Sequence, residues 1–101
     1  MSHFDDLAEL ERRQRQAAQL RLLARDYDAE STKLPDIPRA LNLRLAATQI
    51  RNYATLTERG SISDVDAQDV ITRGSGNIRN HKIARIRSLL ERDGVSYEMN
   101  L

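Results

Sequence analysis

The residues from Leu56 to Met99, LTERGSISDVDAQDVITRGSGNIRNHKIARIRSLLERDGVSYEM, decide the fold of this chain. They read in order as the end of one helix, a glycine break, a short capped helix, a Gly-Ser-Gly turn, a basic amphipathic helix and an alternating tail. This order of elements is typical of a compact helix-turn-helix with a short terminal strand. The stretch therefore makes a nucleic-acid surface the first hypothesis.

Local signals place the helices within this stretch. Ser63 stands three residues before Asp66 in an approximate capping box, and Gly74 and Gly76 allow the backbone to reverse around Ser75. A helix is then expected from about residue 77 to about residue 92. One side of this helix carries Ile83, Ile86, Leu89 and Leu90, and the other carries Asn80, His81, Ala84, Arg85, Arg87 and Ser88. One side is predicted to be buried and the other to offer hydrogen bonds.

The residues before this stretch predict two further helices. We expect the first from about residue 4 to about residue 30, because Ser2 is placed to cap it and no Gly or Pro interrupts it. The six residues 11–16, ERRQRQ, contain nothing apolar, so this part predicts a solvated bridge. A core helix is expected from about residue 38 to about residue 59, where Gly60 stops it.

Both prolines lie in residues 31–38, STKLPDIP, and proline disfavours helical geometry in the residue before it. This segment predicts a rigid linker between two parts of the chain. The expected organisation is an N-terminal helical arm over residues 1–33 and a compact three-helix domain of the helix-turn-helix kind over residues 34–101. The fold class is all-α, with a minimal terminal β-strand pair beside the last helix.

Composition limits the class of protein. With 101 residues, 40% hydrophobic and only 4% aromatic, the chain predicts one small helical domain with an aliphatic core. There is no cysteine and only two histidines, so we expect no disulfide, no metal and no cofactor. The acidic start and the lack of a long apolar run predict a cytoplasmic protein outside the membrane. No spacing of nucleophile and base indicates an enzyme.

The charges are segregated although the net charge is only +1. Residues 71–92 hold six basic residues and one acid. Arginine and asparagine can make paired hydrogen bonds to guanine and adenine edges, so the basic helix suits a major groove of double-stranded DNA. The expected base contacts are Asn80, His81 and Arg85. The expected contacts to phosphates and at the preceding turn are Arg73, Ser75, Asn77, Arg79, Lys82 and Arg87.

Two short phrases in this region resemble the winged helix-turn-helix families of small bacterial and phage regulators. The first phrase comprises Leu56, Gly60, Ile62 and Ser63, and the second comprises Arg85, Ile86, Leu89 or Leu90, Gly94 and Val95. The resemblance covers roughly the last 45 residues. It implies that Ile62 and the tail 95–99 pair as a small sheet beside a recognition helix, and that the chain is a DNA-binding regulator.

Two function classes stay open at the level of sequence. The first is a sequence-specific DNA-binding regulator of bacterial or phage origin that acts as a homodimer. The arm residues expected to pair the two copies are Phe4, Leu7, Leu20, Leu23 and Tyr27. The second is a small helical protein, an inhibitor or adaptor of the phage type, that captures another protein partner through its N-terminal arm.

Overall fold

The computed structural model describes residues 3–74 and 80–94, with side chains described over 6–74 and 85–94. These residues form four α-helices and no strand, which confirms the all-α class. The bounds are α1 His3–Ser31, α2 Ile37–Glu58, α3 Asp64–Arg73 and α4 Asn80–Arg92. The strand expected over residues 95–99 lies outside the described residues.

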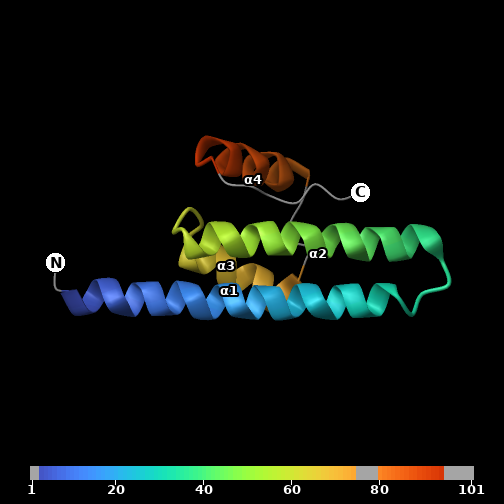
Figure 1. Ribbon diagram of the computed structural model, residues 1–101, viewed down its shortest axis with the longest axis horizontal. Coiled ribbons are helices and arrows are strands. Elements are labelled where there is room, and N and C mark those ends of the chain that lie inside the picture. The colour runs from blue at the N-terminus through green and yellow to red at the C-terminus, as the bar shows by residue number, and fades with distance from the viewer. Residues whose placement is uncertain (1–2, 75–79, 95–101) are drawn as a thin grey trace.

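The two long helices form an antiparallel hairpin, with the short segment 32–36 at its closed end (Figure 1). Asp36 caps α2 by accepting a hydrogen bond from the Arg39 backbone N–H, and Pro38 occupies the first turn, where its missing N–H costs nothing. At the open end α1 continues past the last turn of α2 (Figure 1). The first turns of α1 therefore have no α2 beside them.

Small and branched residues build the interface between α1 and α2. Ala17, Leu20 and Ala24 of α1 are completely buried, as are Ala47, Ile50 and Ala54 of α2. Alanines allow the two helix axes to approach closely, and Leu20 and Ile50 fill the space between them. The chain reverses at segment 32–36, and the apolar contacts between α1 and α2 give both helices one shared core. Proline restricts the backbone around it but does not set where the flanking helices pack.

Most of the polar stretch 11–16 of α1 is exposed, as expected of a solvated segment, but its last residue is buried against α3. Gln16 is only 6% exposed, and its Nε2 donates a hydrogen bond of 2.6 Å to Asp64 Oδ1 at the start of α3. Arg12 pairs with the same carboxylate at 3.1 Å. These contacts hold α3 against α1, so a mostly exposed stretch without apolar residues still takes part in tertiary contacts.

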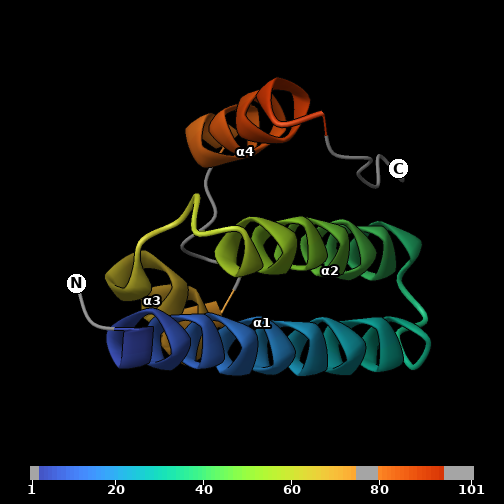
Figure 2. The ribbon, with the colours of Figure 1, turned by 60° about the vertical axis from the view of Figure 1, so that its left-hand side comes forward.

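The second half of α2 is the centre of the molecule, because α1, α3 and α4 all pack on it (Figure 2). The Ser63 side chain caps α3 as expected, accepting from the Asp66 backbone N–H at 3.2 Å. Ala67 and Val70 bury the inner side of α3. Gly74 ends it with φ +76°, a conformation that favours glycine. In Figure 2, α4 lies on the side of α2 opposite α1.

Candidate nucleic-acid interface

One side of α4 is buried against the body of the protein, as its amphipathic pattern predicts. Ile86 is 3% exposed and Leu90 is fully buried, while Leu89 is partly buried against the same core. Burial of an isoleucine and a leucine contributes about 1.5–3 kcal/mol for each side chain. This docking leaves the other sides of α4 facing solvent.

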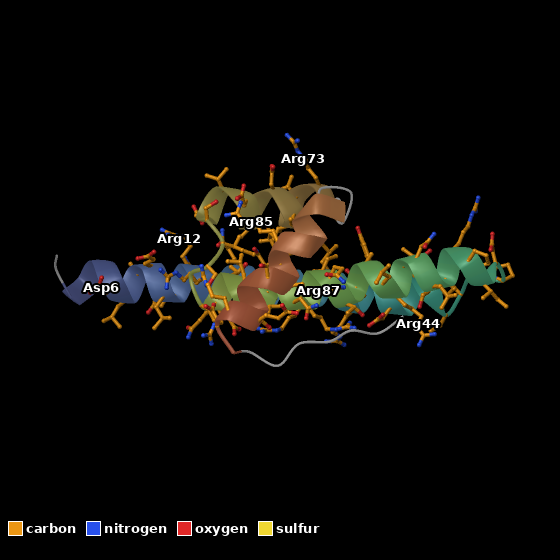
Figure 3. The ribbon with its side chains drawn as sticks, turned by 90° about the horizontal axis from the view of Figure 1, so that it is seen from above. Asp6, Arg12, Arg44, Arg73, Arg85 and Arg87 are labelled. Carbon is orange, nitrogen blue, oxygen red and sulfur yellow. The ribbon has the colours of Figure 1, made fainter. Side chains whose placement is uncertain are left out.

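Arg85 and Arg87 lie on the two flanks of α4. They stand two residues apart, which is about 200° around a helix. In Figure 3, Arg85 lies toward α3 and Arg87 lies on the opposite side of α4. Both are exposed, as is Ser88, and within the described part of the chain neither arginine forms an ion pair. The helix thus presents an exposed positive charge along each of its two edges.

Several other arginines hold the fold together instead. Ion pairs join α1 to α3, α1 to α2, and the residue after α2 to the residue after α4, namely Arg12–Asp64, Arg21–Glu58, Arg51–Asp28 and Arg59–Asp93. Their positive charge is neutralised within the chain. Arg73, an expected phosphate contact, differs from both groups of arginines. It pairs with Asp69 at 3.7 Å, but its side chain is 69% exposed. An exposed pair of this kind is weak, so Arg73 can exchange it for another anion.

The other expected DNA contacts are only partly described. Asn80, His81 and Lys82 belong to the first turn of α4, and their side chains lie outside the described residues. Ser75, Asn77 and Arg79 precede that helix and also lie outside them. The described part of α4 begins at Asn80, and the start expected at about residue 77 lies outside the described residues. The described part of the predicted surface therefore consists of Arg73, Arg85 and Arg87.

The residues expected to pair two copies do not lie on one free surface. Leu20 is fully buried inside the protomer, so it cannot meet a second copy. Leu23 and Tyr27 are partly buried against the same core. Leu7 is exposed near the start of α1, and the Phe4 side chain lies outside the described residues. The stripe Ala17–Leu20–Ala24, at spacings of three and four, was the sequence signal for this buried side.

A cavity of about 290 Å³ lies beside Arg85, where α3 and α4 meet the second half of α2. Its lining includes Tyr53, Ser63 and Asp66. Burial raises the pKa of the Tyr53 hydroxyl to about 12, with a further increase from the negative charge of Asp66 and an opposing effect from Arg85. Arg85 thus lies near a carboxylate as well as at the surface. Nothing in the sequence placed Tyr53 or Asp66 beside it.

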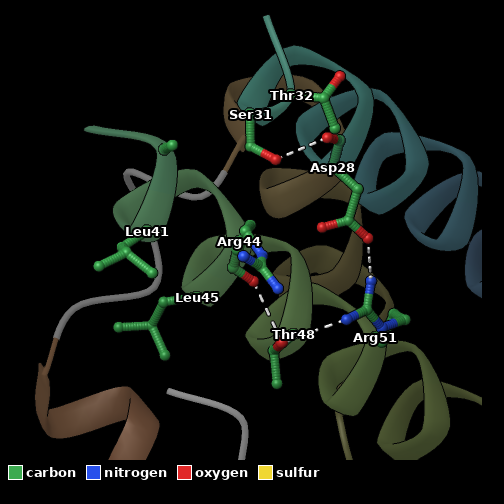
Figure 4. A pocket seen from close by; sticks show the side chains of 9 residues that line it. Asp28, Ser31, Thr32, Leu41, Arg44, Leu45, Thr48 and Arg51 are labelled. Atoms are coloured by element: carbon green, nitrogen blue, oxygen red, sulfur yellow. Dashed lines mark hydrogen bonds and ion pairs between the residues drawn. The ribbon is translucent and has the colours of Figure 1, made fainter. Parts of the chain in front are cut away.

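A larger cavity, about 740 Å³, lies between the end of α1 and the first half of α2 (Figure 4). Its polar groups largely bind one another. Arg51 Nη1 donates to Asp28 Oδ2 at 2.7 Å and Arg51 Nη2 to Thr48 Oγ1 at 3.1 Å, while the Thr48 hydroxyl donates to the Arg44 carbonyl. The Arg51–Asp28 bond joins the two long helices and the other two bonds lie within α2, so we assign this cavity a structural role.

Comparisons of this chain with protein-family models, with curated proteins and with solved structures find no match. Among the helices in the described part of the chain, none combines the length and apolar character needed to cross a membrane. The site is therefore interpreted from its own residues.

Proposed function

We propose that this protein binds double-stranded DNA through α4 and acts as a sequence-specific regulator of the bacterial or phage type. The observation that carries the proposal is the arrangement of α4. Ile86 and Leu90 bury one side of the helix, while Arg85 and Arg87 are exposed on its two flanks and form no ion pair with any described residue. A helix in the major groove lies between two phosphate backbones, and flanking arginines suit contacts to both.

This geometry changes one role expected from the sequence. Arg85 lies on the flank of α4 nearer α3, so we now assign it to a phosphate and not to a base edge. Base reading is assigned to Asn80 and His81, which precede it on the same helix. In this proposal α3 and α4 act as a helix-turn-helix unit, and α1 carries the surface that brings two copies together.

The low net charge makes a clear prediction about salt. The proposed phosphate contacts of one protomer are Arg73, Arg79, Lys82, Arg85 and Arg87. Five such contacts correspond to a slope of log K against log salt of about −4.5 per protomer. Because the whole chain is nearly neutral, with a net charge of +1, this slope must come from the charges around α4 and not from the protein as a whole.

The test compares two variants with the same net charge. Arg87→Gln removes a proposed phosphate contact, whereas Arg25→Gln removes an exposed arginine from the body of α1. We expect Arg87→Gln to weaken binding to sheared genomic DNA several-fold in gel shifts and to reduce the salt slope by about 1. Arg25→Gln should match the wild type. Equal losses from both variants would show that general charge, and not α4, attracts DNA.

A second candidate function rests on the exposed leucines of α1. Leu7 and Leu10 are exposed near the start of α1, and Leu22 is exposed further along the same helix. Exposed apolar side chains grouped on one helix favour a protein partner. If this is the function, light scattering will give a monomeric mass and gel shifts will show no DNA binding. A dimeric mass together with DNA binding supports the regulator instead.

A further inference from the structure

The cavity beside Arg85 has a mixed lining. The second half of α2 contributes Tyr53, the start of α3 contributes Asp66, and α4 contributes Arg85. Ile62, Ile86 and Leu89 supply apolar surface. A volume of about 290 Å³ is at the lower end of the range for small-molecule pockets, which begins at about 300 Å³. The space therefore suits a molecule of amino-acid size.

The two charges of this cavity do not neutralise each other. Asp66 and Arg85 are both described residues that line the same space, and they form no ion pair with each other. Both nevertheless act on the Tyr53 hydroxyl, in opposite directions, so both charges lie close to it. Opposite charges that face one cavity without contact leave room for a ligand between them.

Charge balance then selects the class of ligand. A simple anion would be attracted by Arg85 but repelled by Asp66. A simple cation would be attracted by Asp66 but repelled by Arg85. A molecule with both an ammonium and a carboxylate gains from both residues. Its remaining atoms would lie against Ile62 and Leu89, which are partly buried and apolar.

We propose that this cavity binds a small zwitterion with an apolar side chain, its ammonium facing Asp66 and its carboxylate facing Arg85. Tyr53 also lines the cavity, so its hydroxyl can supply a further hydrogen bond to the ligand. Arg85 is also one of the proposed phosphate contacts, so ligand and DNA would share this residue, but binding of the zwitterion does not require DNA.

The experiment is calorimetric titration of the full chain, without DNA, with three matched probes. L-Leucine carries both charges, 4-methylpentanoate lacks the ammonium, and 3-methylbutylamine lacks the carboxylate. We expect leucine to bind with a Kd of about 1 mM and each analogue to bind about tenfold more weakly. Equal binding of leucine and either analogue, or no binding of leucine at about 20 mM, would overturn the proposal.

Variants identify the site independently of the probes. Arg85→Gln and Asp66→Asn should each weaken leucine binding about tenfold, because each removes one charged partner. Arg87→Gln is the control, since it removes an arginine from the same helix outside the cavity, and it should bind leucine as the wild type does. All three residues are exposed, and matching thermal melts will show that the variants fold. A loss with Arg87→Gln equal to that with Arg85→Gln refutes the site.

Discussion

Replacing Leu20 by alanine tests whether α1 belongs to the core of the protomer. Leu20 is fully buried between α1 and α2, whereas Leu22, two residues further on, is 57% exposed. The two variants change the same side chain in the same helix, so the small gain in helix propensity is common to both. The difference between their losses in free energy of unfolding therefore reports the burial of Leu20 alone.

The expected magnitudes follow from the two environments. Truncating leucine to alanine removes three carbon atoms, worth about 0.8 kcal/mol each when fully buried, or about 2.4 kcal/mol. The cavity left behind in a packed interface brings the loss for Leu20→Ala to about 3–5 kcal/mol. Leu22→Ala, with more than half of the side chain already in water, should cost less than about 1 kcal/mol. For a domain of this size the first loss is a large share of the total stability, which is typically about 5–15 kcal/mol.

Urea unfolding followed by circular dichroism at 222 nm measures both variants, and it should be repeated at two protein concentrations. We expect the free energy of unfolding lost by Leu20→Ala to be independent of concentration, because the contacts lie within one chain. If Leu20 instead paired two copies, the loss would grow on dilution. A loss from Leu20→Ala no larger than that from Leu22→Ala would refute the packing of α1 on α2.

Three further changes test local features of the fold. Ser63→Ala removes the cap of α3 and should lower the free energy of unfolding by about 0.5–2 kcal/mol in urea titrations, with Ser88→Ala on the exposed side of α4 as the control. Gly74→Ala should lower the melting temperature, because φ there is +76° and a Cβ would collide with the Tyr27 hydroxyl; a melting temperature equal to that of the wild type would contradict this conformation. In an absorbance titration Tyr53 should ionise with a pKa of about 12. Because this folded pKa lies above the ordinary value of 10.0, the associated stability is complete below pH 10 and is lost as the pH rises toward 12, and Tyr53→Phe should remove that loss.

Local signals predicted the helices well, because each depends on residues close in sequence. Ser63 and Gly74 start and end α3 as expected, and Pro38 lies in the first turn of α2. The apolar spacing of Ile86 and Leu90 correctly identified the buried side of α4. Capping bonds, glycine conformation and amphipathic spacing all act within one or two helical turns.

Contacts between helices were predicted less well, because they depend on how distant segments meet. Leu20 was predicted to contact a second copy of the chain. It lies instead in the core with Ala17 and Ala24, which stand three and four residues from it. Gln16 reads as a solvated residue, yet it hydrogen-bonds to Asp64, which lies 48 residues away. The sequence shows that Gln16 is polar, but it does not show that Asp64 lies within hydrogen-bonding distance of it.

The candidate site likewise combines local features, which the sequence predicted, with contacts between distant segments, which it did not. By itself the sequence determined an all-helical body and a last helix with one apolar side and several arginines. Helix propensity and the periodicity of apolar residues depend only on residues that are neighbours in the sequence. Only the tertiary structure decided that α1 folds back onto α2, and that Arg85 shares a cavity with Tyr53 and Asp66 while Arg87 stands apart from it. Those relations arise because burial and electrostatic interactions depend on distance in space, which the order of residues along the chain does not specify.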